Sequence, residues 1–243
     1  MATKSLTGKH NYAEFSAETI KARVQKMLAF RDQVDVEKEH VKFSYENRKT
    51  GALVPSVSLI PVADCRNCRV CSRGCYDVRN VCLWSTVQKN RAINSAIYHR
   101  APEKYWDEIR QRVKSLRFFR YHIGADIQNS LYLHQIVTIA QETPTCEFLV
   151  FTKMYHLVNE FLADYPVHEF PKNLHVILSG WKGDTNQNPH NLPVSSPVWK
   201  DGQQSCMVTN DVIWCPGDCS ACAETNGGCW GLKKGQTVLF EAH

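Results

Sequence analysis

The chain has 243 residues, of which 43% are hydrophobic, and a formal net charge of +5. Its length and apolar content suffice to bury a core without disulfides, so we expect one domain over residues 1–243. The most apolar runs are far shorter than the roughly 20 residues of a membrane-spanning helix, and the first residues lack a signal segment. From these features we expect a cytoplasmic protein without membrane contact. The modest charge gives weak support to nucleic-acid binding.

The N-terminal part, residues 1–50, is expected to be a helical extension. Ser16 is an N-cap candidate for a helix over residues 16–33, in which Ile20, Val24 and Met27 share one face. Residues 51–60 are aliphatic and β-branched and precede the first cysteines, so they predict a strand that leads into a cysteine loop. Pro55 weakens that prediction.

The middle of the chain alternates between strand and helix patterns. Strands are expected over 118–123, 146–151 and 174–178, and helices over 83–98, from Pro102, over 133–140 and over 154–162. Such alternation predicts parallel strands joined by right-handed crossovers. The expected fold is therefore α/β with a mostly parallel sheet.

The last part is less regular. Residues 179–204 are rich in Gly, Asn, Pro and Asp and predict an irregular excursion. Residues 207–214 suggest a last short strand, and after the final cysteines only residues 237–240 have an ordered pattern. We expect residues 205–243 to form a cysteine-rich segment packed on the same domain.

Eight of the eleven cysteines fall into two groups, which in a reducing compartment favours metal ligands or buried thiols over disulfides. The first group has the spacing C-x2-C-x2-C-x3-C of a bacterial ferredoxin run, although Tyr76 replaces the usual proline. The preferred interpretation is that this group binds an iron–sulfur cluster of the 4Fe-4S type. Zinc binding and unmetallated thiols are the alternatives. Arginines 66, 69, 73 and 79 would offset the negative charge of a cluster. The group comprises Cys65, Cys68, Cys71 and Cys75.

The second group contains a C-x3-C-x2-C run, which is also the spacing of a radical S-adenosylmethionine cluster loop. In such a loop three cysteines hold the cluster and the fourth iron binds S-adenosylmethionine. Its late position in the chain and a fourth cysteine that would close that iron count against this role, and a zinc knuckle is the alternative. The group comprises Cys215, Cys219, Cys222 and Cys229.

Polar residues at the carboxyl ends of three expected strands are candidates for a binding pocket, because α/β folds bind ligands there. They are His122, Asp126, Lys153 and Trp181. Each has a structural alternative: His122 and Trp181 as core residues, Asp126 as a helix cap, and Lys153 as a solvated residue. The pocket hypothesis requires the Asp126 carboxylate to share a cleft with His122 or Lys153 that opens toward a cysteine-bound cluster.

The chain resembles the phage gene product 88 family, which occurs in phages and mobile elements. The resemblance covers residues 57–230 and rests on short motifs: SLIPVADC, RFFRYHIGAD, FTK, and the late CPG-x-C-x2-C loop that closes with Cys229 and Trp230. It implies a partial (β/α) barrel of the radical S-adenosylmethionine type with two cysteine-rich metal-binding loops. It does not imply a particular activity.

Two functions are therefore open. The first is an iron–sulfur redox or radical-type enzyme, with a reductant protein as a candidate partner and S-adenosylmethionine as a candidate cofactor. The second is a zinc-stabilised nucleic-acid-binding module without catalytic activity. Replacing Cys68 and Cys71 by Ala should cost both metal and protein, whereas Ser at Cys146 or Cys206, both expected to be buried thiols, should leave the metal content unchanged.

Overall fold

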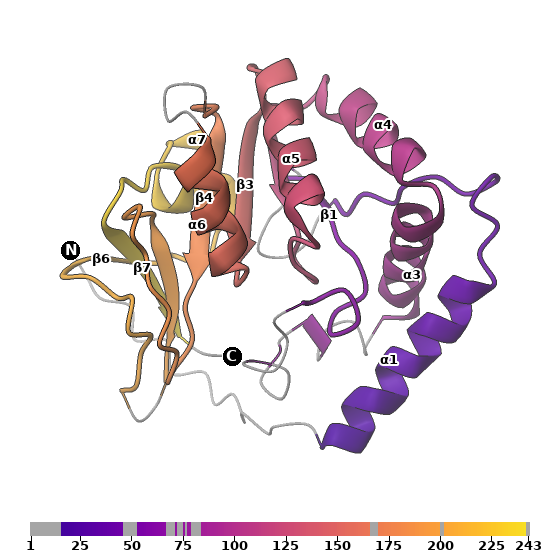
Figure 1. The fold of residues 1–243 in the computed structure, drawn as a ribbon, viewed down its shortest axis with the longest axis horizontal. Coiled ribbons are helices and arrows are strands. Elements are labelled where there is room, and N and C mark those ends of the chain that lie inside the picture. Colours follow the sequence, from indigo (N-terminus) through magenta and orange to yellow (C-terminus); the bar gives the residue numbers. More distant parts are fainter. Residues whose placement is uncertain are drawn as a thin grey trace.

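The computed structural model describes residues 16–45, 53–66, 71, 75, 77–78, 84–165, 170–199 and 202–241. Its centre is a seven-stranded sheet with the strand order β1-β2-β3-β4-β5-β7-β6, in which all neighbouring strands are parallel. The α/β class and the parallel sheet are thus confirmed. The sheet is open, with β1 and β6 at its edges (Figure 1). The strands are β1 (Ser56–Val57), β2 (Phe118–Tyr121), β3 (Glu147–Thr152), β4 (Leu174–Ser179), β5 (Val194–Val198), β6 (Asp211–Trp214) and β7 (Gln236–Glu241).

The helices follow the expected positions closely. Ser16 caps the first helix by accepting the Thr19 N–H, and Pro102 opens the helix that begins there. None of the described helices is long and apolar enough to cross a membrane. The helical elements are α1 (Ala17–Asp32), α3 (Ser85–Arg100), α4 (Pro102–Val113), α5 (Ser130–Glu142), α6 (Tyr155–Asp164), α7 (Cys219–Glu224) and the 3-10 turn η3 (Gly228–Trp230).

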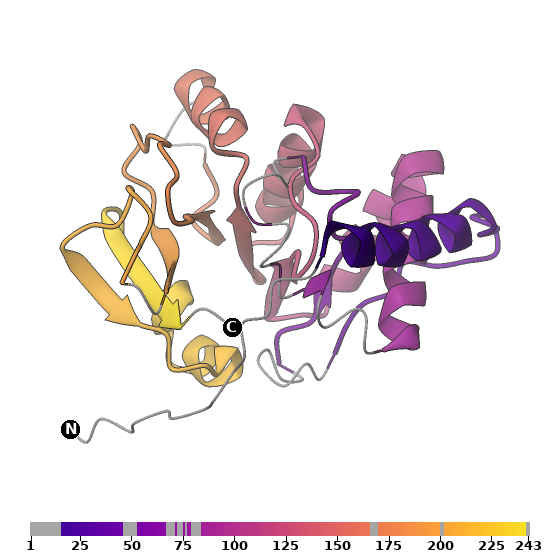
Figure 2. The same ribbon diagram turned by 90° about the horizontal axis from the view of Figure 1, so that it is seen from below.

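The two faces of the sheet are covered differently. Alternate residues such as Phe119 and Phe148 pack with α3 to α6 in the largest apolar cluster. Their neighbours Phe118 and Leu149 face the other way and pack with Ala223 of α7 and Trp230 of η3. Figure 2 shows α5 and α6 on one side of the strands and α7 on the other. The late cysteine-rich segment therefore covers the face that the larger helices leave open.

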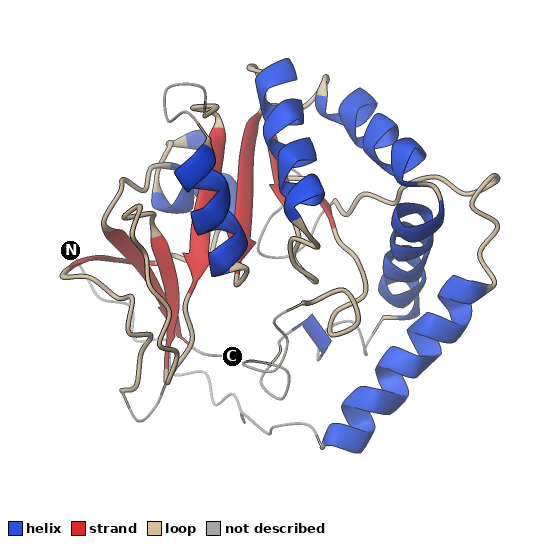
Figure 3. Ribbon diagram, in the orientation of Figure 1, coloured by secondary structure: helices blue, strands red, loops and turns tan. Residues whose placement is uncertain are grey.

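Helix α1 packs against the segments that flank the first cysteine group. Its buried residues Ile20, Val24 and Met27 form a cluster with Ile60 and Val78. Figure 3 shows α1 beside α3, at the margin of the molecule. The N-terminal helix is thus packed on the domain, where it supports the chain on either side of the first cysteines.

Three predictions of secondary structure were incomplete or wrong. The strand expected over 51–60 is limited to Ser56–Val57, because Pro55 precedes it and the chain turns after it. Residues 179–204 contain β5, which was missed because its sequence VSSPV is polar and includes Pro197. Pro197 is tolerated because β4 pairs only with Val194 and Ser195 of this strand. Helix α7 and η3 were not expected between β6 and β7.

Candidate functional site

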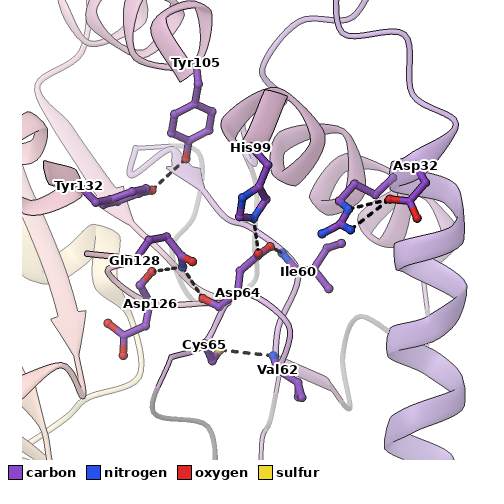
Figure 4. Close-up of polar contacts among 11 residues, drawn as sticks. Asp32, Ile60, Val62, Asp64, Cys65, His99, Tyr105, Asp126, Gln128 and Tyr132 are labelled. Carbon is purple, nitrogen blue, oxygen red and sulfur yellow. Dashed lines mark hydrogen bonds and ion pairs between the residues drawn. The ribbon is translucent and has the colours of Figure 1, made fainter. Parts of the chain in front are cut away.

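The first cysteine of the chain ends a tight turn that follows β1. The Asp64 carboxylate accepts the Ile60 N–H at 2.9 Å and lies 2.8 Å from His99 Nε2 (Figure 4). The Cys65 sulfur accepts the N–H of Val62 at 3.4 Å. Val62 has a φ of +70°, which is unusual for a branched side chain and costs on the order of 1–3 kcal/mol. The turn is thus strained so that a backbone amide points at the sulfur.

The loop after β2 is strained in the same way and lies against this turn. His122 and Ala125 have φ angles of +57° and +76°. The Gln128 side-chain amide donates to the backbone oxygens of both Asp64 and Asp126, which joins the two loops (Figure 4). Unfavourable backbone angles therefore cluster where the first two strands end, and such clustering is typical of functional sites.

Asp126 links the ends of β2 and β3. Its carboxylate accepts the Lys153 N–H at 2.8 Å, the Thr152 hydroxyl at 2.6 Å and the Ile127 N–H at 2.7 Å. Burial raises the pKa of this carboxyl above its usual value, while these hydrogen bonds act in the opposite direction. The alternative that Asp126 caps the next helix is wrong, because Asn129 caps α5. Asp126 thus lies at the carboxyl edge next to Lys153.

Lys153 and Trp181 are brought together beside Asp126. The Lys153 ammonium donates to Ser179 Oγ at 2.9 Å and lies 5.4 Å from the centre of the Trp181 ring. Both side chains are half-buried. Three of the four expected pocket residues therefore meet at the ends of β2, β3 and β4.

His122 lies apart from this group. It is 2% exposed, and its Nε2 lies 2.7 Å from the Tyr132 hydroxyl, which in turn is 3.1 Å from that of Tyr105. Burial lowers the pKa of His122 to about 3, so the ring is neutral at pH 7. The structure places His122 in a buried polar chain that faces α4 and α5.

Two other cysteines of the first group are described, Cys71 and Cys75, and both are half-buried. Burial raises the pKa of Tyr155 above its usual range, and the charges of Asp184, Asp126 and Cys71 raise it further. Burial, with the charge of Asp77, raises the pKa of Cys75 to about 12. Cys68 lies outside the described residues.

A buried ion pair holds the chain just after Cys75. Asp77 accepts a hydrogen bond from the Arg91 guanidinium of α3, and both side chains are almost fully buried. A Cβ atom on Gly124 would lie 1.8 Å from Asp77 Oδ2 and 2.6 Å from Arg91 Nη1. Gly124 therefore lets the β2 loop lie directly on this pair, and the pair fixes the end of the first cysteine group.

The four thiols of the second group gather under the other face of the sheet. Burial and the charges of Cys215, Cys219 and Cys222 raise the pKa of Cys229 to about 12, although Arg120 of β2 opposes this. The Cys222 sulfur is 2.6 Å from where a Cβ of Gly228 would lie. Trp230 packs against Phe118 at 5.1 Å between ring centres. All four cysteines are half-buried, and none of them is in a disulfide.

In the described part of the chain, no three His, Cys, Asp or Glu side chains are arranged closely enough to hold a metal ion. The donor chemistry nevertheless fits a thiolate-bound centre, because each group supplies several cysteines within a short stretch of sequence and the Cys65 sulfur accepts a backbone N–H. Metal binding stays a prediction.

The two remaining described cysteines differ from each other. Cys146 is fully buried, as expected. The prediction that Cys206 is buried was wrong, because it lies in an exposed turn where its N–H binds Asp184 and its thiol donates to the Asn186 oxygen. The neighbouring Met207 takes the interior position instead.

Sequence reasoning missed several residues of this edge. Asp77 and Arg91 gave no signal, since a distant ion pair cannot be read from spacing. Trp199 follows β5 and packs on Trp181 at 5.0 Å, and it was missed together with that strand. Tyr155, whose hydroxyl donates to the Ser179 oxygen, was taken for a helix residue only.

The fold and site define a parallel α/β protein with a cysteine loop directly after its first strand and a second cysteine group under the sheet. The chain belongs to the gene product 88 family, whose family model matches residues 27–231. Searches of curated proteins and of solved structures found no match to the chain. The family assignment from the short motifs is thus confirmed, over a longer stretch than the motifs themselves cover.

Proposed function

We propose that the chain is an iron–sulfur protein that carries a cluster on its first cysteine group and acts as a redox or radical-type enzyme. The observation that supports this proposal is the Cys65 turn. The turn follows β1 at the carboxyl edge, and its strained backbone directs the Val62 N–H at the Cys65 sulfur. Amide hydrogen bonds to cysteine sulfur stabilise thiolate ligation and tune the potential of such clusters.

The neighbouring groups support a reaction site at this edge. The Gln128 side chain joins the Cys65 turn to the loop of Asp126, and Asp126 binds the backbone of Lys153. When bound, a cluster would supply one-electron transfer. The ammonium of Lys153 and the hydroxyl of Ser179 would bind and orient a polar substrate next to it.

The proposal extends to the architecture. From β1 to β5 the strand order follows the chain, and the larger helices cover one face of the sheet. Both features suit a partial (β/α) barrel, in which the first cysteine loop occupies the place of a radical S-adenosylmethionine cluster loop. We therefore assign the candidate S-adenosylmethionine role to the first group, and to the second group the role of a metal staple that holds α7 and η3 under the sheet.

The test is anaerobic purification with iron and sulfide counts on matched variants. The wild type should be brown, absorb broadly near roughly 400 nm and hold roughly four or eight irons per chain. Cys65→Ala should lose the irons of the first centre, and Cys146→Ser, a buried thiol away from both groups, should keep them all.

Three other outcomes would be informative. Stoichiometric zinc without iron would replace this proposal by the zinc-stabilised module. Full iron in Cys65→Ala would remove the first group as the site. A reduced cluster whose paramagnetic resonance signal is unchanged by S-adenosylmethionine would leave an electron-transfer centre and exclude the radical-type role.

A further inference from the structure

Two tryptophans and two lysines converge where β3, β4 and β5 end, and we call them the Trp–Lys platform: Lys153, Trp181, Lys182 and Trp199. The two indole rings meet edge to face with their centres 5.0 Å apart. The Lys182 ammonium lies 4.5 Å from the Trp199 ring centre and that of Lys153 lies 5.4 Å from the Trp181 ring centre. Each ring is thus paired with a cation.

These rings are not part of the core. Both are half-buried, and neither belongs to the three apolar clusters of the described residues. An indole placed only for packing would contact those clusters, because burial of its large apolar surface is what stabilises the fold. The rings of the platform instead combine partial exposure with neighbouring charge.

Local hydrogen bonds fix the backbone that carries the two rings. The backbone N–H of Trp181 donates to the Asp184 carboxylate at 2.9 Å, and Gly180 has no room for a side chain because a Cβ would lie 2.5 Å from Ser205. On the other side, the Gly202 N–H binds the Trp199 oxygen at 2.8 Å, with Gly202 at a φ of +75°. The backbone that carries both rings is therefore ordered before a ligand binds, so binding would not have to order it.

We propose that the Trp–Lys platform binds single-stranded nucleic acid. Unpaired bases would stack on Trp181 and Trp199, and phosphates would pair with Lys153 and Lys182. Partly exposed aromatic rings beside ammonium groups are the combination that single-strand-binding surfaces use. The net charge of +5 favours the same class of ligand.

The inference rests on the proposed function in one respect, namely that the bound strand would be the substrate of the proposed enzyme. Lys153 belongs both to the platform and to the Asp126 site, and the Gln128 side chain joins that site to the Cys65 turn. A bound strand would thus pass beside the proposed cluster. Binding itself requires no cluster, so the two proposals can fail separately.

Binding is tested with fluorescein-labelled oligothymidylate and oligouridylate of about ten nucleotides, followed by anisotropy at several salt concentrations. Trp181→Ala and Trp199→Ala should each weaken binding by about tenfold, and Lys182→Met should lower the salt slope by about 1. Trp84→Ala and Lys114→Met, at exposed positions just before α3 and just after α4, should leave binding unchanged. Far-ultraviolet circular dichroism checks that each variant is folded. If Trp181→Ala does not fold, the variants Trp199→Ala and Lys182→Met test the platform.

The platform is supported if the wild type binds either oligomer and the tryptophan variants lose this binding. The oligomer that binds more tightly shows whether the ligand is DNA or RNA. Absence of binding to both, or tryptophan variants that bind like the wild type, overturns it. Iron is counted on the same preparations. A protein with full iron and no binding refutes the platform alone, and one that binds without iron refutes the proposed cluster alone.

Discussion

The two cysteine groups are held in place by different forces. Around the first group, polar contacts orient the chain in addition to the apolar packing of α1: the Asp64 turn, the Asp77–Arg91 ion pair and the Gln128 bridge. Around the second group the contacts are apolar, with Trp230 and Ala223 packed on the sheet. Polar contacts of this kind depend on orientation, whereas apolar packing depends on area.

This difference suits different roles. A site that must place a thiolate beside a substrate needs fixed orientation, and it tolerates backbone strain such as that of Val62. A staple needs only to hold two layers together. The comparison predicts that damage to the apolar contacts will affect stability most, and that damage to the polar contacts will affect the carboxyl edge first.

The largest effect is expected from Trp230→Ala. Trp230 is 2% exposed and packs on Phe118 and His175, so its loss should lower the free energy of unfolding by about 3–5 kcal/mol. Urea titration followed by circular dichroism measures it, with Trp84→Ala, 66% exposed, as the control. A loss as small as that of the control would show that apolar packing does not hold the second group.

A smaller loss is expected from Gly124→Ala. The added methyl group would overlap the Asp77–Arg91 pair and force it to move, at about 1–3 kcal/mol. The control is Gly227→Ala, whose Cβ would lie 3.1 Å from a side-chain hydroxyl that can turn away. Equal unfolding midpoints for the two variants would contradict the role assigned to the ion pair.

The smallest effect is expected from Asp126→Asn. An amide has one acceptor oxygen where the carboxylate has two, so one buried donor among Thr152, Ile127 and Lys153 loses its partner, at about 1–2 kcal/mol. Asn129→Asp, which keeps a capping oxygen on α5, should cost a few tenths of a kcal/mol. A similar small cost for both would contradict the role assigned to Asp126 in linking the ends of β2 and β3.

The regular part of the fold was predictable from sequence because apolar periodicity is a local property. Helix α1 with its Ser16 cap and helix α4 with Pro102 at its start were found within a few residues of their observed bounds. Strand β5 was not predicted. Its Ser195 and Ser196 are buried because the strand pairs with β4 and β7, and no local sequence pattern reveals this pairing.

The candidate site was predictable only in part. The carboxyl ends of strands pointed to Asp126, Lys153 and Trp181, which do meet. The direction of a side chain was not predictable: His122 follows β2 immediately, yet its positive φ turns the ring toward Tyr132. For the same reason Trp199 and the Asp77–Arg91 pair could be found only in three dimensions.

The position of β7 has a consequence for biosynthesis. Strand β7 is inserted between β5 and β6, so β6 has no partner within the described sheet until residues 236–241 have been made. The first five strands pair in the order in which a ribosome delivers them, and a growing chain folds in that direction. The cysteines between β6 and β7 therefore reach their final positions after the carboxyl edge has formed.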